Sequence, residues 1–261
     1  MPAEPEDRLT TAEWPEIVQK IRARTPARLL AGRTGAGYRT STQMELREAH
    51  AAARDAVRLE LDLKKDFDAE FIRHWNLFEV ATQATTKEDY LLRPDLGRRL
   101  HDEGREKISA RCSGNNDLQI VVGDGLSVTA VKAQVPKLLE LLHQQATARH
   151  WKVGQTFVIR HCRVGILNEI GELLAPQVAV LLIGERPGLA TAESLSAYLA
   201  HRPNKTHTDA DRNLISNIHS RGVSTQQAAE RIINLAACMI DAQTSGCKLR
   251  EELATFVRLA E

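Results

Sequence analysis

Three short apolar runs limit what this chain can fold into: DLQIVVGD, QTFVIRHCRV and VAVLLIGE. They begin at Asp117, Gln155 and Val178, and segments with helical features lie between them. Strands that alternate with helices build a mostly parallel sheet. Wholly apolar strands are those that neighbouring elements cover on both faces. The sequence therefore predicts an α/β fold in which a mostly parallel sheet is flanked by helices.

The segments between and after these strands carry helix signals. KLLELLHQQATAR (residues 137–149) has helical spacing, and Pro136 is expected to split it from the segment before it. NEIGELLA (168–175) predicts a short helix. Ser224 is expected to cap a long final helix that stops before Gly246.

Two other segments in this half are harder to assign. ESLSAYLAH (residues 193–201) fits a helix or a strand. In TDADRNLISNI (208–218), Thr208 is followed three residues later by Asp211, which is typical of a capped helix. We therefore expect residues 208–218 to be helical.

Residues 1–110 are expected to form a mostly helical N-terminal region. Thr11 is placed to cap a first helix, and Thr40, with Gln43 three residues on, resembles a capping box for a second. Pro94 is expected to open a third helix.

Two glycine-rich segments were considered as ligand loops. The spacing of Gly32–Gly37 matches neither a phosphate loop nor a dinucleotide fingerprint, so a mobile loop is favoured. GDGLS (123–127) follows a strand and opens a helix. It could let a ligand approach the backbone and the free N–H groups of a helix. It could equally be a tight turn in which Ser127 caps the helix.

Ligands of parallel sheets bind at the carboxyl ends of the strands, where Asp124, Val164 and Glu185 all fall. Glu185 is the best single candidate, because a carboxylate can accept hydrogen bonds from a ligand's amides or hydroxyls. It could instead pair with Arg186 or another arginine for structure. No second carboxylate or histidine stands at a fixed spacing from it, so no catalytic residue is assigned.

Composition excludes several classes of function. The 35 basic and 34 acidic residues leave a net charge of +1, which argues against a nucleic-acid partner. The four cysteines are scattered and indicate neither a zinc site nor a disulfide framework, so free buried thiols are favoured. The spacing of His201, His207 and His219 fits no common metal site. If the protein belongs to an enzyme, another chain or a cofactor is expected to supply the chemistry.

No apolar run approaches the roughly 18 residues that a membrane helix needs. The N-terminal sequence MPAEPEDRLTTAEW is acidic and polar, and it lacks the apolar core of a secretory signal. We therefore expect a cytoplasmic protein with no membrane partner.

Five segments together resemble the small subunit, or light chain, of ethanolamine ammonia-lyase. They are YLLRPDLGRRL, DLQIVVGDGLS, RVGILNEIGELL, VAVLLIGERPGL with ESLSAYL, and TDADRNLISNIHSRG. The resemblance is close from about Tyr90 to Gly246 and looser over 28–39. It implies a Rossmann-like domain, here residues 111–261, that contacts cobalamin.

The resemblance also implies a function. The family's enzyme converts ethanolamine to acetaldehyde and ammonia by a radical mechanism that depends on adenosylcobalamin. A large subunit carries the substrate site and most reacting groups, and the small subunit clamps the cofactor against it in a hetero-oligomer.

Three cobalamin-binding positions of the family fall on Val164, Glu185 and Leu214 of this chain. The family can have cysteine at the third position, so Leu214 removes any thiol role there. Val164 and Leu214 could pack on apolar cofactor surface, and Glu185 could accept hydrogen bonds from its amides.

Two further features bear on this resemblance. NIHSRG (217–222) is similar to the DxHxxG motif of other cobalamin enzymes, whose histidine binds cobalt, but its first residue is Asn217. His219 is therefore not assigned as a cobalt ligand. Residence in a bacterial microcompartment is an option of the family, against which the short acidic N-terminus argues.

Two alternatives stay open. One is a stand-alone Rossmann-like nucleotide-binding protein, against which the missing phosphate loop counts. The other is a non-catalytic interaction subunit that has lost cobalamin binding, for which Leu214 is the one hint in the sequence.

Overall fold

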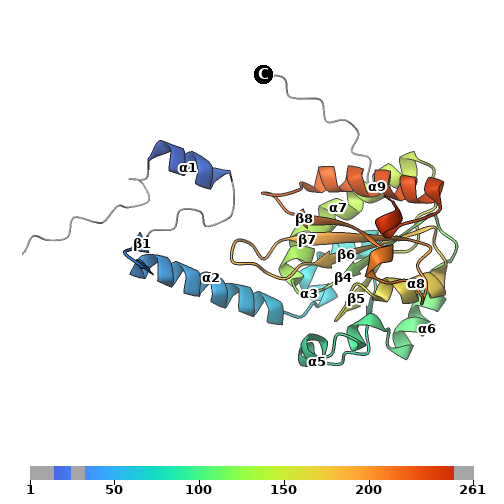
Figure 1. Cartoon of the computed structure of the whole chain (residues 1–261). Helices are drawn as coiled ribbons and strands as arrows, with labels where there is room; N and C mark the ends of the chain where they lie inside the picture. The colour runs from blue at the N-terminus through green and yellow to red at the C-terminus, as the bar shows by residue number, and fades with distance from the viewer. Residues whose placement is uncertain (1–14, 25–32, 250–261) are drawn as a thin grey trace, which may run out of the picture.

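The computed structural model describes residues 15–24 and 33–249, and their centre is a six-stranded mixed sheet (Figure 1). Its strand order is β3-β5-β4-β6-β7-β8. The strands are β3 (Glu79–Ala81), β4 (Leu118–Gly123), β5 (Phe157–Arg160), β6 (Val178–Gly184), β7 (Leu195–His201) and β8 (Asn213–Ile218). The first four strands in this order are parallel, and β7 and β8 run antiparallel to their neighbours. The predicted α/β fold with a mostly parallel, helix-flanked sheet is confirmed.

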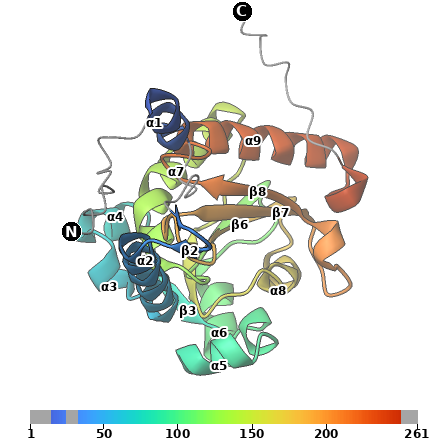
Figure 2. The ribbon, with the colours of Figure 1, turned by 60° about the vertical axis from the view of Figure 1, so that its left-hand side comes forward.

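Helices cover both faces of this sheet (Figure 2). On one face α7 (Val128–Ala148) and α9 (Thr225–Ala242) pack over the side chains of Ile120, Val180 and their neighbours. On the other face α6 (Asp102–Arg111) and α8 (Ile166–Leu174) pack over Val121, Leu181 and their neighbours. All residues of β4 and β6 are buried, which explains why both read as unbroken apolar runs.

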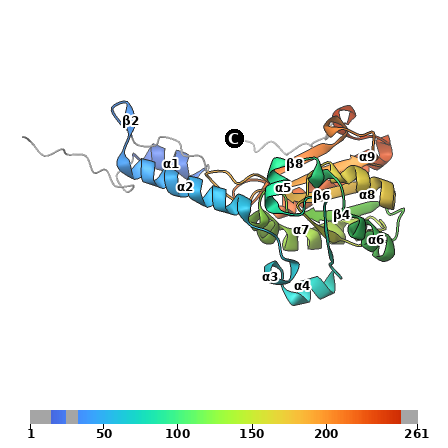
Figure 3. The same ribbon diagram turned by 90° about the horizontal axis from the view of Figure 1, so that it is seen from below.

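The N-terminal part is mostly helical, as predicted, and α2 runs outward from the sheet (Figure 3). Its elements are α1 (Glu16–Ala23), β1 (Arg33–Thr34), β2 (Gly37–Tyr38), α2 (Thr40–Arg58), α3 (Leu63–Asp66), α4 (Ala69–His74), α5 (Lys87–Leu92) and the 3₁₀ turn η2 (Leu96–Arg98). Among the described residues, Ala56 is the one buried residue of α2.

The division of the chain at residue 110 stays a prediction. β3 lies before that boundary and pairs with β5 after it, so the sheet takes strands from both sides.

The glycine segment near residue 35 forms a β-hairpin rather than a loop. Arg33 pairs with Tyr38, and Gly35 has a φ of +59°, which glycine adopts without strain. Gly32 and the predicted cap Thr11 lie outside the described residues. The capping box predicted at Thr40 is wrong, because Thr40 is already helical and its N-cap, Arg39, makes no side-chain capping bond.

Two proline-based predictions also need correction. Pro94 does not open a helix to Arg111, because η2 and an extended segment intervene before α6 begins at Asp102. Pro136 does not split its helix, because α7 continues through it. The carbonyl that loses its helical partner belongs to Lys132, an exposed residue, so water can reach that part of the helix.

The predicted helix over residues 208–218 is wrong beyond its first turn. The capping box of Thr208 and Asp211 is present, but it caps only the 3₁₀ turn η3 (Asp209–Asp211), and β8 follows. Ile215 and Ile218 are buried three residues apart because a register shift separates their pairing partners on β7. This spacing imitates a helix.

The other predictions for this half hold. Residues 195–201 form β7, which settles the ambiguity of ESLSAYLAH in favour of a strand. The short helix α8 is present, and Ser224 caps α9 in a capping box with Gln227. A short 3₁₀ turn, η4 (Gly246–Lys248), follows α9. Within the described parts of the chain, no helix is long and apolar enough to span a bilayer.

The environment of His143 predicts how stability depends on pH. This residue of α7 packs on Trp75, with 4.3 Å between the ring centroids. Burial, with a smaller effect of His74, lowers the pKa of His143 to about 4. The unfolded chain takes up this proton near pH 6.5, so stability is full above about pH 6.5 and is lost as the pH falls toward 4.

We therefore expect His143→Gln to lose less stability than the wild type between pH 7 and pH 4.5, by up to about 3 kcal/mol. Urea unfolding at the two pH values measures this difference. His150→Gln, a change at an exposed position, is the control and should follow the wild type. Identical pH dependence in all three proteins would contradict the prediction.

Candidate functional site

A cavity of about 370 Å³ lies at the carboxyl edge of the parallel strands. Segments that follow β4, β5 and β6 contribute to its lining, together with Tyr90 and residues of β7 and β8. Val164, Glu185 and Leu214 all line it. The structure thus brings together three residues that are separated by up to 50 positions in the sequence.

The sheet accounts for this convergence. Glu185 directly follows β6, and Val164 lies four residues beyond β5, so parallel pairing puts both at one edge. Leu214 belongs to β8, where it pairs with Tyr198 of β7. Leu214 is 47% exposed, which is unusual for a large apolar side chain on a strand. The cavity therefore presents apolar surface beside a carboxylate.

The carboxylate of Glu185 has three donors from its own chain. Ser194 Oγ and Ser196 Oγ each donate to it over 2.6 Å, and the backbone N–H of Asn217 donates over 2.9 Å. The alternative in which Glu185 pairs with an arginine is wrong, because its partners are two serines and an amide. A carboxylate offers about four acceptor positions, so about one remains for a ligand.

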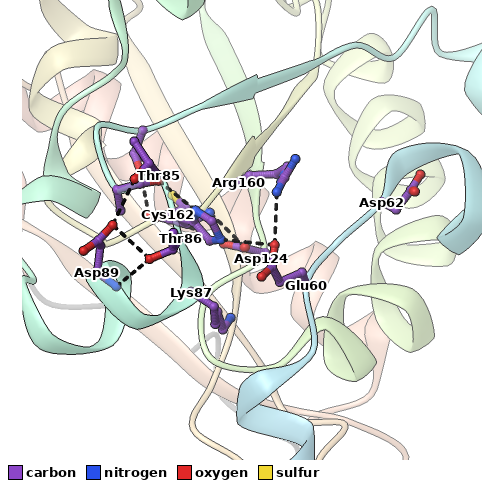
Figure 4. Close-up of polar contacts among 12 residues, drawn as sticks. Glu60, Asp62, Thr85, Thr86, Lys87, Asp89, Asp124, Arg160 and Cys162 are labelled. Atoms are coloured by element: carbon purple, nitrogen blue, oxygen red, sulfur yellow. Dashed lines mark hydrogen bonds and ion pairs between the residues drawn. The ribbon is translucent and has the colours of Figure 1, made fainter.

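A buried carboxylate, Asp124, lies at the same edge (Figure 4). Its two oxygens accept hydrogen bonds from the backbone N–H groups of His161 at 2.8 Å and Cys162 at 2.9 Å. Burial raises the pKa of Asp124, and the charge of Lys87 opposes that rise. Asp124 therefore fixes the turn that leads from β5 to Val164.

The interpretation of GDGLS as a tight turn capped by Ser127 is confirmed, and the interpretation as a ligand loop stays a prediction. Ser127 caps α7 by accepting a hydrogen bond from the N–H of Ala130 at 3.2 Å. Gly125 and Leu126 line the cavity, and Gly125 has a φ of +58°. A Cβ at Gly125 would come within 2.3 Å of the carbonyl oxygen of Gly184, so glycine is required there.

Two residues of α5 support the cavity, and neither was predicted as a site residue. Tyr90 Oη donates to the carbonyl oxygen of Cys162 at 3.1 Å, and Lys87 Nζ donates to that of Gly125 at 3.3 Å. Burial lowers the pKa of Lys87, while Asp124 and Glu60 oppose that effect. The signal that could have located α5 in the sequence is local: Thr86 caps this helix by accepting a hydrogen bond from the N–H of Asp89.

A further polar contact joins the end of α2 to this edge (Figure 4). Arg160, the last residue of β5, lies 3.1 Å from Glu60, which follows α2. Arg160 also lies 3.6 Å from Glu79 of β3. Burial raises the pKa of Glu79, and Arg160 opposes that rise. The outward-running helix is thereby tied to the strand end that leads to Val164.

His219 makes local hydrogen bonds with both nitrogens of its ring. His219 Nε2 lies 2.8 Å from Asn217 Oδ1, and His219 Nδ1 accepts from the N–H of Arg221 at 3.2 Å. Both ring nitrogens thus stabilise the turn after β8. Within residues 15–24 and 33–249, no group of three or more His, Cys, Asp or Glu side chains could hold a metal ion. The four cysteines are free, and only Cys162 is buried.

Together these features define a class of protein: an α/β protein with a cavity at the carboxyl edge of a mostly parallel sheet. The chain belongs to the ethanolamine ammonia-lyase light chain family, because the model of that family matches residues 15–250. The resemblance drawn from the five sequence segments is confirmed at this level.

Curated relatives agree with the family match. An ethanolamine ammonia-lyase small subunit from Clostridium perfringens is 41% identical over 235 residues, which cover 90% of this chain and 78% of the relative. The protein of the same name from Clostridium acetobutylicum is 37% identical, with 90% and 95% covered. Another, from Fusobacterium nucleatum, is 38% identical over 242 residues, with 93% and 80% covered.

We predict that Asp124→Asn lowers the free energy of unfolding by about 1–3 kcal/mol. The amide group of asparagine can accept at only one of the two buried N–H groups, and Lys87 loses the opposing charge. Urea unfolding measures the change, and Asp102→Asn is the control because its side chain is 85% exposed. Equal stability of the two variants would show that Asp124 does not hold the turn.

Proposed function

We propose that this chain is the small subunit of an ethanolamine ammonia-lyase, which converts ethanolamine to acetaldehyde and ammonia. Membership of the light-chain family over nearly the whole chain carries the proposal. We further propose that the chain holds adenosylcobalamin against a large subunit, and that the large subunit supplies most reacting groups.

The cavity fits this cofactor in its chemistry. Cobalamin has a broad ring with apolar faces and an edge of amide side chains. Val164 and the exposed face of Leu214 match the apolar part. Glu185 keeps about one acceptor position that an amide N–H could use. Leu214 replaces a cysteine that the family can have, so its contribution is apolar contact.

The roles of this chain's residues are to bind and to orient. When bound, adenosylcobalamin would supply the radical chemistry. Asp124 and Tyr90 fix the turn before Val164, and the two serines and Asn217 fix Glu185. A site fixed in advance loses little freedom when a ligand binds, which favours affinity.

We propose that His219 does not bind the cobalt of the cofactor. A histidine with both ring nitrogens already engaged would have to break the turn after β8 to reach a metal. Free thiols are typical of a reducing compartment, and we propose a cytoplasmic enzyme.

The first test is acetaldehyde release from ethanolamine in the presence of adenosylcobalamin and the cognate large subunit, with and without this chain. We expect activity only when both chains are present, because each holds part of the cofactor site. Full activity of the large subunit alone would overturn the proposal. Thermal stabilisation of this chain by a dinucleotide would instead support the stand-alone nucleotide-binding alternative.

The second test concerns the cavity. We expect Val164→Asp to weaken cyanocobalamin binding to the assembled complex at least tenfold, because it puts a charge against apolar ligand surface. Equilibrium dialysis measures the affinity. Ala148→Asp adds the same charge at an exposed position of α7, at the opposite edge of the sheet, and should bind as the wild type does. Unchanged affinity in Val164→Asp would exclude this cavity as the cofactor site.

A further inference from the structure

A second and larger hollow, which we call the charged cleft, adjoins the cavity. Its volume is about 790 Å³, and its walls are residues 95–105, one side of α8 and residues 205–212. Neither the family match nor the sequence motifs assign it a role. Its lining is dominated by charged side chains.

Two separate chain segments border both hollows. Val164 lines the cavity, and the next residue, Gly165, lines the charged cleft. Arg212 lines the cleft, and Leu214, two residues later, lines the cavity. Burial raises the pKa of Tyr198, the strand partner of Leu214, and smaller effects come from Glu185, which lines the cavity, and from Asp209 and Arg212, which line the cleft. A ligand that leaves the cavity across this border therefore enters the charged cleft.

Pairing of charges leaves the cleft with unmatched cations. Arg105 is paired with Glu169 and Arg212 with Asp209, while Asp95 pairs with Arg93. Within the described residues, no hydrogen bond or ion pair engages the side-chain nitrogens of Arg98, Arg99 and Lys205. Two carboxylates of the lining oppose these three cations: Glu172, which accepts from the backbone N–H of Lys205 at 3.2 Å, and Asp95, whose charge attracts Arg99 as well as Arg93.

A buried donor in the wall is also unsatisfied. The side chain of Arg212 is 4% exposed, yet its Nε has no partner in the described structure. Its other nitrogens are used, one on Asp209 and one on Asn168 at 2.7 Å. Buried donors in proteins normally have partners, and Arg105 Nε, which belongs to the same cleft, lacks one as well.

Arg98 links the two hollows. Its aliphatic part packs on Gly165, where an added Cβ would come within 3.0 Å of Arg98 Cγ. The side chain of Arg98 thus lies against the residue that follows Val164. Guanidinium groups bind phosphate oxygens in bidentate geometry, and charge-assisted hydrogen bonds of this kind are among the stronger ones.

The geometry points to a phosphodiester-binding subsite: we propose that the charged cleft binds the nucleotide-loop phosphodiester of cobalamin through Arg98, Arg99 and Lys205. The inference rests on the proposed function. The cavity alone is at the lower end of the volume that drug-sized ligands occupy, and cobalamin is much larger than such ligands. The phosphodiester is the negatively charged part of the loop that extends from the ring.

The test is a comparison of corrinoids on the assembled two-subunit complex. Cyanocobalamin has the complete nucleotide loop, dicyanocobinamide lacks the loop and its phosphate, and dicyanocobinamide phosphate carries the phosphate without the base. Equilibrium dialysis gives the affinity of each for the wild type and for Arg98→Gln/Arg99→Gln. Both arginines are exposed, so the double variant should fold.

We expect the double variant to bind cyanocobalamin and cobinamide phosphate at least tenfold more weakly than the wild type, and cobinamide equally well. Inorganic phosphate should compete for the wild type and not for the variant. The control Arg149→Gln/Lys152→Gln removes the same charge at the opposite edge of the sheet and should bind all three ligands as the wild type does.

Other outcomes overturn the inference. Equal weakening for all three corrinoids would mean that the arginines act on the whole site, and a variant that no longer assembles would mean that the cleft binds an acidic segment of the large subunit. A loss for cyanocobalamin alone would assign the cleft to the base. If the wild-type complex binds no corrinoid, the proposed function itself fails, and the two failures are thereby distinguished.

Discussion

Burial of β4 and β6 on both faces is the constraint on which the rest of this structure depends. With helices on each side, these strands have no solvent-exposed face, so they can be apolar throughout and pair in parallel. In parallel pairing every strand enters the sheet at one edge and leaves it at the opposite, carboxyl edge. The residues that leave the strands there, among them Glu185 and the turn before Val164, are concentrated at one place.

The carboxyl edge also contains buried backbone N–H and C=O groups, which polar side chains must satisfy. The turns at the carboxyl edge bring backbone N–H groups into a region shielded from water, where an unpaired polar group is costly. Asp124 satisfies two of them, and Lys87 and Tyr90 satisfy carbonyl groups in the neighbouring turns. Lys87 and Asp124 also compensate each other's buried charge. The same contacts that satisfy the backbone therefore fix the shape of the cavity.

The sequence predicts much of this arrangement because apolar runs and capping boxes are local signals. DLQIVVGD and VAVLLIGE identify two central strands, and Ser224 marks the start of α9. What local signals miss depends on contacts between distant segments. The register shift between β7 and β8 lets Ile215 and Ile218 both be buried, although their spacing of three residues is that of a helix. The position of α5 beside the cavity depends on the neighbouring η2 and the edge strand β3. The strand-end pattern pointed to Val164 and Glu185, the family resemblance added Leu214, and the convergence of the three on one cavity needed the fold.

Glu185 shows how a binding site can be rigid and still accept a hydrogen bond from a ligand. Three donors from β7 and β8 hold its carboxylate, so it does not need a ligand to be satisfied. The cost of ordering it is met during folding, and a ligand gains the remaining acceptor position without that cost. Leu214 differs from Glu185, because its exposed apolar surface contributes favourable free energy only when a ligand buries it. A ligand that fits must therefore offer a hydrogen-bond donor to Glu185 and an apolar surface to Leu214. This combination of a donor and an apolar surface, more than the size of the cavity, determines which ligands can bind at this edge.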